Sequence, residues 1–216
     1  MTVITHRDRR KQDLRNQILE TAREIFMRDG FEDFSMRKLA AQIGYSAGNL
    51  YLYFENKEQL FDRLVEQSFE RLLAALQELR DDPGQDDPVR LLLQGLKVYV
   101  DFGLRSPNDY RFAFMLRPPR KCQAYEPHAA FNVLRSMVKR CVEHKRFRKE
   151  DVELASQSLW MAAHGVTSLL IQRPSFPWVD KNKLVDQVLR NAVQGFVRSD
   201  PDRNGKGGNH GNHGIG

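Results

Sequence analysis

The stretch SAGNLYLYFENKEQLF, residues 46 to 61, decides how the fold of this 216-residue chain is read. Tyr51, Tyr53 and Phe54 follow closely after an Ala-Gly pair. Aromatic side chains normally belong to a core, whereas small residues let another molecule approach the backbone. The stretch therefore predicts a divided role, in which side chains such as Leu50 and Phe54 pack inward and the others face a partner.

Two short helices are expected around this stretch. Ser35 is a good N-cap for a helix through Ile43, which Gly44 ends. A second short helix is expected from about Ser46 to Tyr53. Two short helices joined by a tight turn are the layout of a helix-turn-helix, whose second helix enters the major groove of DNA.

Longer helices are expected on both sides of this pair. Upstream, apolar residues recur at helical spacing from Leu14 to Phe26, and Gly30 follows where a C-terminal cap would lie. Downstream, Asn56 with Gln59 three residues later resembles a capping box that opens a long helix. Its apolar stripe consists of Leu60, Phe61, Leu64, Val65, Phe69, Leu72, Leu73, Leu76 and Leu79.

The second half of the chain also has a helical pattern. The segment DDPGQDDP, residues 81 to 88, breaks the composition and is a candidate inter-domain junction. Asp87-Pro88 and Ser106-Pro107 each resemble an N-cap followed by proline at the first helical position. Further helices are expected near residues 88 to 105, 107 to 116, 127 to 145, 150 to 172 and 181 to 198.

The predicted fold class is all-α, because no strand alternation of useful length and no internal repeat occurs. A three-helix helix-turn-helix domain is placed at residues 1–60, with its core at 13–60 and a basic arm at 1–12. A larger helical bundle is placed at residues 61–199. Residues 200–216 are dominated by Gly and Asn with almost nothing apolar to bury, which predicts a disordered tail.

The second short helix and the starts of its neighbours supply the candidate DNA contacts. Asn49 can bond adenine through two hydrogen bonds, and Ala47 can pack on a thymine methyl group. Lys57 stands at a helix start, where its ammonium and the free N–H groups both favour phosphate. The alternatives are that Tyr51 packs inside the three-helix unit and that Lys57 is simply solvated. The candidate DNA-binding residues are Ser35, Arg37, Ser46, Ala47, Gly48, Asn49, Tyr51, Tyr53 and Lys57, while Leu50, Phe54, Leu60 and Phe61 are expected in the core.

Over residues 17 to 61 the chain resembles the DNA-binding domain of the TetR family of bacterial repressors. The resemblance rests on a first helix ending in F-x-x-x-G-F, on LAAQIGYS and on G-x-L-Y-x-Y-F-x-x-K-E-x-L. Asn49 departs from the pattern, because family members more often carry a small hydroxyl residue there. The resemblance implies a two-fold dimer whose C-terminal domain binds a small molecule and pairs through its last two long helices.

The charge of the chain bears on how it would bind DNA. The formal net charge is +6, but residues 1–60 carry ten basic and nine acidic side chains, which leaves +1. Binding would therefore need a localised basic face and two copies that each neutralise a few phosphates. The basic arm either follows the DNA backbone or minor groove, or is a floppy charged terminus. The predicted partner is a double-stranded, pseudo-palindromic operator bound by a homodimer.

The expected helix at 150 to 172 combines features of pairing and of ligand binding. It is apolar around much of its surface, which suits burial against its own bundle and a partner, with an ordinary monomer core as the alternative. Trp160 and His164 lie four residues apart on one face, and W-x-x-x-H-G resembles one subgroup of the family. A cavity facing this pair would be apolar with one titratable group. The candidate ligand-binding residues are Tyr99, Phe102, Tyr110, Phe112, Met115, Trp160 and His164, with Phe114 on the same helices, and plain core packing is the alternative for each.

Other classes of function find little support. The chain has no Gly-rich phosphate loop and no G-x-S-x-G motif, so an enzyme is not expected. Cys122 and Cys141 lack metal or disulfide spacing, and His210 and His213 in the tail would make a poor metal site, so we expect no metal or cofactor. No apolar run approaches membrane-spanning length and no signal peptide is visible, which predicts a cytoplasmic protein.

These observations predict a sequence-specific transcriptional regulator. The expected mode is a repressor that a small apolar or aromatic effector releases from its operator. The alternatives are an activator or an effector-independent DNA-binding protein and, from another class, a helical ligand carrier or enzyme whose first domain only mimics the motif.

Overall fold

The computed structural model describes residues 6–80, 87–116, 128–148 and 151–198. These residues are helical almost throughout and contain no strand beyond one isolated bridge between Phe147 and Val197. The all-α prediction is confirmed. The helices are α1 (His6–Asp29), α2 (Met36–Ile43), α3 (Ala47–Tyr51), α4 (Lys57–Arg80), α5 (Pro88–Arg105), α6 (Pro107–Tyr110), the π-helix η1 (Arg111–Met115), α7 (Ala129–Glu143), α8 (Val152–Gln172) and α9 (Lys181–Gln194).

Local capping chemistry sets the limits of the two short helices, as the sequence predicts. The Ser35 hydroxyl accepts a hydrogen bond from the Lys38 backbone N–H at 3.2 Å and starts α2. Gly44 ends α2 with a φ of 73°, a left-handed conformation that costs glycine little. The Ser46 hydroxyl accepts from the Asn49 N–H at 3.3 Å and starts α3. The turn between α2 and α3 is thus fixed by local sequence.

Asn56 and Gln59 also cap α4 in the predicted way. The Asn56 side chain accepts from the Gln59 N–H at 2.7 Å, and the Gln59 side chain accepts from the Glu55 N–H at 2.8 Å. The backward bond therefore reaches one residue before Asn56, where an ordinary capping box would reach Asn56 itself. The backbone N–H groups of Glu55 and Gln59 at the start of α4 are therefore both hydrogen-bonded.

Two of the later helices differ from their predicted form. The expected helix at 107–116 divides into the single turn of α6 and the wider coil of η1. Ser106 precedes Pro107 as predicted but makes no side-chain capping bond. Asp87 does cap α5, because its carboxylate accepts from the Val89 N–H at 3.0 Å. The helix α9 ends at Gln194, four residues before the predicted limit.

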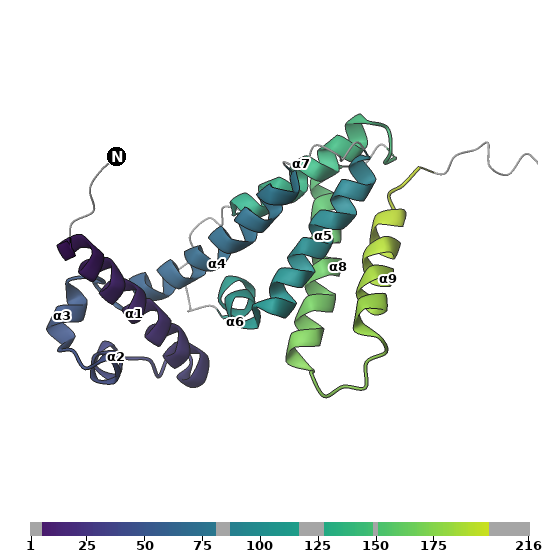
Figure 1. The fold of residues 1–216 in the computed structure, drawn as a ribbon. Coiled ribbons are helices and arrows are strands. Elements are labelled where there is room, and N and C mark those ends of the chain that lie inside the picture. The colour runs from purple at the N-terminus through teal and green to yellow at the C-terminus, as the bar shows by residue number, and fades with distance from the viewer. Residues whose placement is uncertain (1–5, 81–86, 117–127, 149–150, 199–216) are drawn as a thin grey trace, which may run out of the picture.

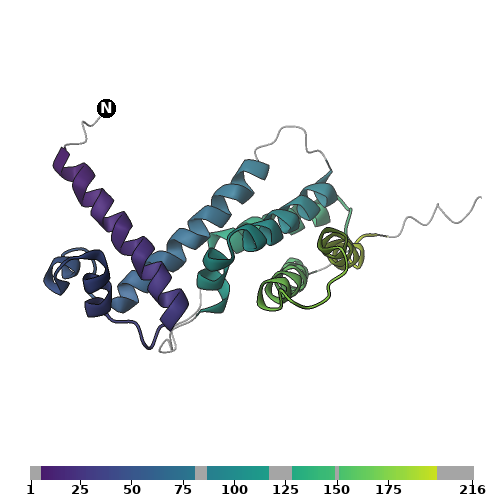
Figure 2. The ribbon, with the colours of Figure 1, turned by 60° about the horizontal axis from the view of Figure 1, so that its bottom comes forward.

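The buried residues form two separate hydrophobic cores. The first core joins α1, α2, α3 and the first turns of α4, and Figure 1 shows these helices at one end of the molecule. The second core joins the rest of α4 to α5, α7, α8 and α9. We call these parts the head and the bundle. The helix α4 extends from one to the other, and α8 and α9 lie beside each other at the far end in both ribbon views (Figures 1 and 2).

The position of α4 shows that the predicted inter-domain junction at residues 81 to 88 is wrong. Residues on both sides of the 81–88 segment, such as Leu76 and Leu91, belong to the same core. The composition break is therefore not a junction between the two cores. The division at residue 60 stays a prediction, although α4 contributes buried residues to both cores. Residues 6–12, part of the predicted arm, are the first turns of α1, and the predicted tail at 200–216 lies outside the described residues.

Candidate nucleic-acid interface and ligand cavity

The α3 helix carries both core residues and an exposed face. Leu50 and Phe54 are buried, as are Leu60 and Phe61 on α4, which agrees with the predicted core. On the other side, Asn49 is exposed and the Tyr51 side chain is 52% exposed. A Cβ added at Gly48 would meet only the Ser46 hydroxyl at 3.9 Å, so the backbone here is open to a close neighbour. We call Gly48, Asn49 and Tyr51 the reading surface.

Four further predicted DNA-binding residues, on α3 and on the segments around it, differ in their surroundings. The exposed Arg37 lies on α2. The Lys57 ammonium donates to the Phe31 carbonyl at 3.1 Å and lies 4.4 Å from the centre of the Phe31 ring. Tyr53 is half-buried and packs against the first core, as does Ala47. A phosphate bound at Lys57 would therefore compete with the Phe31 carbonyl and ring for the Lys57 ammonium. The DNA contacts of all nine candidate residues stay predictions.

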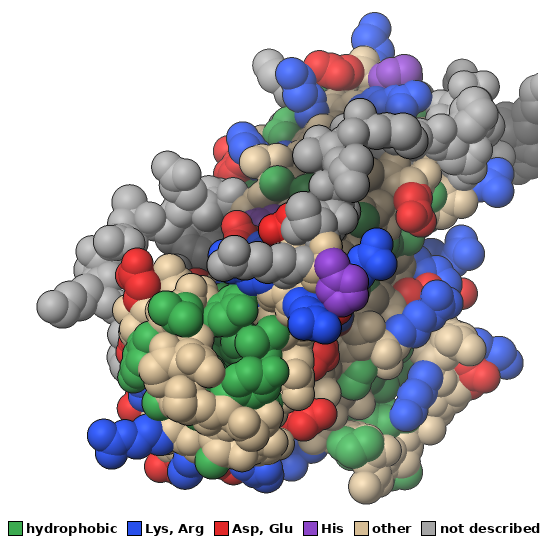
Figure 3. All heavy atoms as spheres, turned by 60° about the vertical axis from the view of Figure 1, so that its left-hand side comes forward, with side chains coloured by type: hydrophobic (Ala, Val, Ile, Leu, Met, Phe, Trp, Pro, Cys, Tyr) green, Lys and Arg blue, Asp and Glu red, His purple; other side chains and the backbone are tan. Residues whose placement is uncertain are grey.

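Two exposed apolar residues beside α3 were missed by the sequence reasoning. Leu52 is 78% exposed and Tyr45 is 42% exposed, and both flank the α3 helix. Figure 3 views the molecule from this end and shows hydrophobic side chains gathered on a face that has Lys and Arg along its margin. The exposure of Leu52 could not be predicted from the run Leu50, Leu52, Phe54, because the sequence alone does not distinguish an exposed leucine from a core leucine.

The bundle encloses a cavity of about 270 Å³ between α4, α5, α7, α8 and η1. Its lining is mainly apolar, and the polar side chains among its described residues are those of Tyr99, His128, Glu153, Gln157 and Trp160. Such a hollow is the usual form of a small-molecule site. The aromatic rings that line it are those of Phe69, Tyr99, Phe114, His128, Phe131 and Trp160.

The predicted ligand-binding residues divide into two groups. Tyr99, Trp160 and Phe114 line the cavity. Tyr110 and His164 lie directly behind Tyr99, while Phe102 and Met115 pack against the second core without lining the cavity. Phe69, His128 and Phe131, which do line it, were not predicted because their place depends on how α4 and α7 pack.

The prediction for Phe112 is corrected by its position in the first core. Its ring lies 5.4 Å from the Phe61 ring and 6.2 Å from the Phe26 ring. Phe112 and Phe114 are two residues apart and face opposite sides of η1, so Phe112 points into the head while Phe114 faces the cavity. Phe112 is therefore part of the joint between head and bundle.

A chain of hydrogen bonds leads away from the cavity wall. The Trp160 indole N–H donates to the Tyr99 hydroxyl at 3.2 Å, and the Tyr99 and Tyr110 hydroxyls lie 3.1 Å apart. The Tyr110 hydroxyl lies 2.6 Å from Nδ1 of His164. The indole N–H and both hydroxyl groups find acceptors if Tyr99 donates to Tyr110 and Tyr110 donates to an unprotonated Nδ1, an assignment made from the network.

Burial keeps each member of this chain uncharged at neutral pH. It raises the pKa of the Tyr99 hydroxyl well above its usual range and the pKa of Tyr110 to about 12. It lowers the pKa of the His164 imidazole below its ordinary value. The wall behind Tyr99 therefore offers dipoles and no formal charge.

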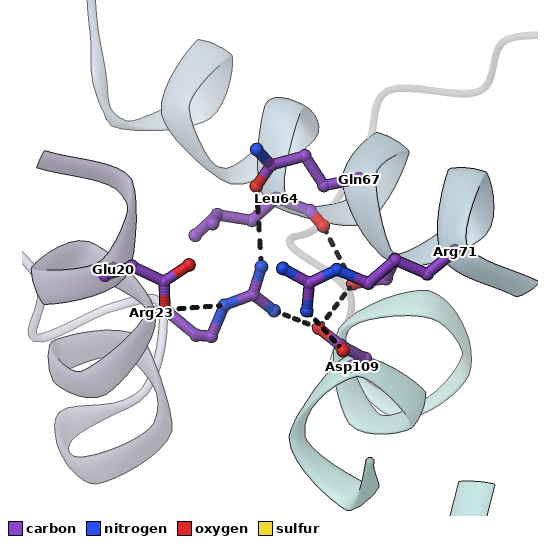
Figure 4. Close-up of polar contacts among 7 residues, drawn as sticks. Glu20, Arg23, Leu64, Gln67, Arg71 and Asp109 are labelled. Carbon is purple, nitrogen blue, oxygen red and sulfur yellow. Dashed lines mark hydrogen bonds and ion pairs between the residues drawn. The ribbon is translucent and has the colours of Figure 1, made fainter. Parts of the chain in front are cut away.

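A buried ionic cluster lies next to this chain, where α6 meets the head. Asp109 is 5% exposed, and its carboxylate accepts from Arg23 of α1 at 2.5 Å and from Arg71 of α4 at 2.7 Å. The Ser68 hydroxyl lies 3.3 Å from the same carboxylate, and Gln67 accepts from Arg23 at 3.5 Å. Figure 4 shows the two guanidinium groups converging on Asp109 from different helices. One carboxylate thus ties together three elements.

The α6–η1 segment joins the cavity to the head through successive residues. Asp109 binds Arg23 in the head, and Tyr110 contacts the cavity wall through Tyr99. Phe112 packs in the first core, and Phe114 lines the cavity. A displacement of this segment by a ligand would therefore reach the head directly.

The described residues also limit other kinds of site. Within them, no three His, Cys, Asp or Glu side chains group where they could hold a metal ion. None of the described helices is long and apolar enough to span a membrane.

Comparisons with known protein families identify both halves of the chain. Residues 18–64 match the family described as bacterial regulatory proteins, tetR family. Residues 92–196 match the family described as the tetracyclin repressor-like C-terminal domain. The first match covers α2, α3 and most of the head, and the second covers the cavity-bearing helices from α5 to α9.

Similar proteins include regulators from several bacteria. The chain is 40% identical over 67 residues to the HTH-type transcriptional regulator UidR of Escherichia coli K12, which is 31% of this chain and 34% of UidR. It is 35% identical over 72 residues to an uncharacterized HTH-type transcriptional regulator of Haemophilus influenzae, 33% of this chain and 38% of that protein. The matches therefore span only a little over a third of each relative.

Solved structures share most of the fold. A protein of unknown function from Rhodococcus sp. RHA1 superimposes with a TM-score of 0.72 at 21% identity, covering 86% of this chain and 96% of that one. The TetR family transcriptional regulator PfmR from Thermus thermophilus gives a TM-score of 0.61 at 22% identity, covering 84% and 99%. At this level of identity the likeness concerns the fold alone.

Proposed function

The chain belongs to the TetR family of bacterial regulatory proteins, and from this premise we propose that it is a repressor released from its operator by a small apolar or aromatic molecule. As a member of this family it is a DNA-binding transcriptional regulator and not an enzyme. The proposal adds the direction of control and the effector. The observation that carries it is the α6–η1 segment, which contacts both the cavity and the head.

The reading surface of the head would contact the operator. The open backbone at Gly48 and the exposed side chains of Asn49 and Tyr51 support this role. Asn49 would read a base edge and the Tyr51 hydroxyl would reach a phosphate. The helix is short, so few contacts are available from one copy. Two heads on one operator would supply the rest, with their α3 helices about 34–36 Å apart.

A homodimer is supported by the outer face of α8. Leu154, Met161 and Leu169 are 60%, 70% and 52% exposed on this helix, and Met161 also borders the cavity. The Gly165 backbone between them has nothing within 4 Å of an added Cβ. Large exposed apolar side chains that follow one helix face are typical of an interface between copies. Pairing of α8 and α9 with a second copy would place two heads on the same side of the dimer.

Release would follow from a difference in affinity between two conformations. A ligand that presses on Tyr99 and Phe114 would move the α6–η1 segment, since Phe114 is part of it and Tyr99 bonds to Tyr110. Asp109 and Phe112 would transmit that movement to Arg23 and to the first core. The ligand shifts the equilibrium only by as much as it prefers the state that does not fit the operator.

The direct test uses the protein and the DNA upstream of its own gene. Fluorescence anisotropy at moderate salt should give binding to this fragment at least about a thousandfold tighter than to random DNA of equal length. Binding no tighter than to random DNA contradicts the proposal. A screen of small apolar and aromatic molecules should then find ligands that raise the melting temperature and weaken operator binding together. A ligand that strengthens binding would make the protein an effector-assisted binder instead.

A further inference from the structure

The cavity has an unusual charge balance for a hollow in a basic chain. Among the residues that the structure describes, none that lines the cavity is a lysine or an arginine. The one ionised side chain in that lining is Glu153. His128 also lines the cavity, and burial lowers the pKa of its imidazole despite the opposing effect of Glu66 and Glu70. The imidazole is therefore neutral at pH 7.

Aromatic rings form a nearly continuous belt around the cavity. The His128 ring stacks on Phe69 at 4.1 Å, and Phe69 lies 5.2 Å from Phe114. Phe114 lies 6.4 Å from Trp160, which lies 5.7 Å from Phe131. Aromatic ring faces carry negative electrostatic potential and attract ammonium groups that come within about 6 Å. Several such rings around one space make a cage for an organic cation.

Carboxylates lie on the helices that carry this belt. Glu153 lies on α8 with Gln157 one turn on, and Gln157 donates to it at 2.9 Å. Glu153 also pairs with Arg135 at 2.9 Å, and both side chains are about half-exposed, so the pair is easily exchanged. Glu66 and Glu70 share Arg63. Glu153 lines the cavity, and Glu66 and Glu70 act on His128, which also lines it, so this group holds three carboxylates and two arginines.

We propose that the cavity selects a hydrophobic organic cation, such as an aromatic or alkyl ammonium compound. The proposal rests on the proposed function, because it names the chemical class of the effector. The hydrocarbon body would fill the space between Leu72, Leu96 and Met137, and the cationic group would lie among the rings near Glu153. An anion of the same size would be desolvated without a described cationic partner in the lining, which is strongly unfavourable.

The test compares three ligands with one phenylpropyl body that ends in a trimethylammonium, a tert-butyl or a carboxylate group. Isothermal calorimetry should show the cation binding about tenfold tighter than its uncharged isostere, and the carboxylate binding weakest. Equal or tighter binding of the carboxylate overturns the proposal, and so does equal binding of the uncharged isostere. Failure of all three to bind at about 1 mM overturns it as well.

Two variants connect the preference to the side chains. Glu153→Gln should remove most of the advantage of the cation and leave the affinity of the tert-butyl ligand unchanged. Phe131→Leu should reduce the advantage while keeping an apolar wall. Glu143→Gln, at an exposed carboxylate on α7 paired with Lys139, is the matched control and should change neither affinity. A melting curve of each variant checks that it is folded. An unaltered cation preference in folded Glu153→Gln and Phe131→Leu contradicts the assignment.

Operator binding measured in the same samples separates this proposal from the one it rests on. If the uncharged ligand releases the operator and the cation does not, the ligand class is wrong and the regulated repressor stands. If the ligand-free protein does not distinguish its operator from random DNA, the proposed function is wrong whichever ligand binds.

Discussion

The head and the bundle are both packed from amphipathic helices, but the head is filled and the bundle is hollow. In the head, the Phe26 ring stacks on Phe34 at 3.9 Å and meets Phe61 edge-on at 5.2 Å. In the bundle, aromatic rings surround a space of about 270 Å³. A filled core holds a reading surface in one geometry, whereas a hollow core leaves room for a ligand to change the packing.

The first prediction concerns the cluster that ties these two regions together. Asp109→Ala removes the shared partner of Arg23 and Arg71. Among the described residues, Arg23, which is 7% exposed, then keeps only the long polar contacts to Glu20 at 3.9 Å and Gln67 at 3.5 Å. The free energy of unfolding should fall by about 3–5 kcal/mol, as measured by urea denaturation. The control is Asp101→Ala, a half-exposed carboxylate near Lys97 and Arg105, with a loss below about 1 kcal/mol. Equal losses of unfolding free energy in the two variants would show that the Asp109 cluster does not stabilise the contact between head and bundle.

The second prediction tests the contrast between filled and hollow cores. Phe26→Ala should cost about 3–5 kcal/mol of unfolding free energy, because it opens a void in close packing. Phe131→Ala should cost about 1–2 kcal/mol, because its half-buried ring already borders an empty space. Chemical denaturation of both variants gives the difference. A Phe131 loss as large as that of Phe26 would show that the cavity wall is as rigid as the head.

The third prediction concerns the reading surface. Tyr51→Ala should weaken operator binding by about 1–3 kcal/mol without lowering the melting temperature, because the side chain is 52% exposed. Tyr51→Phe should lose a similar amount if the hydroxyl bonds a phosphate, and little if the ring alone is used. Anisotropy titrations at two salt concentrations measure both. Wild-type affinity in the alanine variant would remove Tyr51 from the interface.

The smallest expected effect is a pH dependence confined to the bundle. The folded-state pKa of His164 is lowered by burial, so the unfolded chain binds more protons as the pH falls below about 6.5. Stability should therefore be complete above this pH and decrease as the pH is lowered toward the folded pKa. His164→Gln should flatten the dependence of the melting temperature between about pH 5 and 7. An unchanged slope would assign the effect to other groups, of which His128 is the next candidate.

Sequence reasoning located the helices of the head with few errors because their signals are local. Ser35, Gly44 and Ser46 act on residues within four positions, and burial of Leu50 and Phe54 follows from helical spacing. The same reasoning found Trp160 and Tyr99 at the cavity because large aromatic residues in a bundle commonly face its interior. It grouped Phe112 with Tyr110 and Phe114, although residues two apart on a helix face opposite sides, and Phe112 lies in the first core.

The sequence by itself therefore determined the all-α fold, the helix-turn-helix and most helix limits, because caps and periodicity act over a few residues. Only the tertiary structure decided that Asp109 meets Arg23 across 86 positions, that His128 stacks on Phe69, and that η1 joins the cavity to the head. Each of these depends on how helices far apart in the chain pack against one another. That packing is set by the fit of whole helix surfaces, which no short stretch of sequence contains.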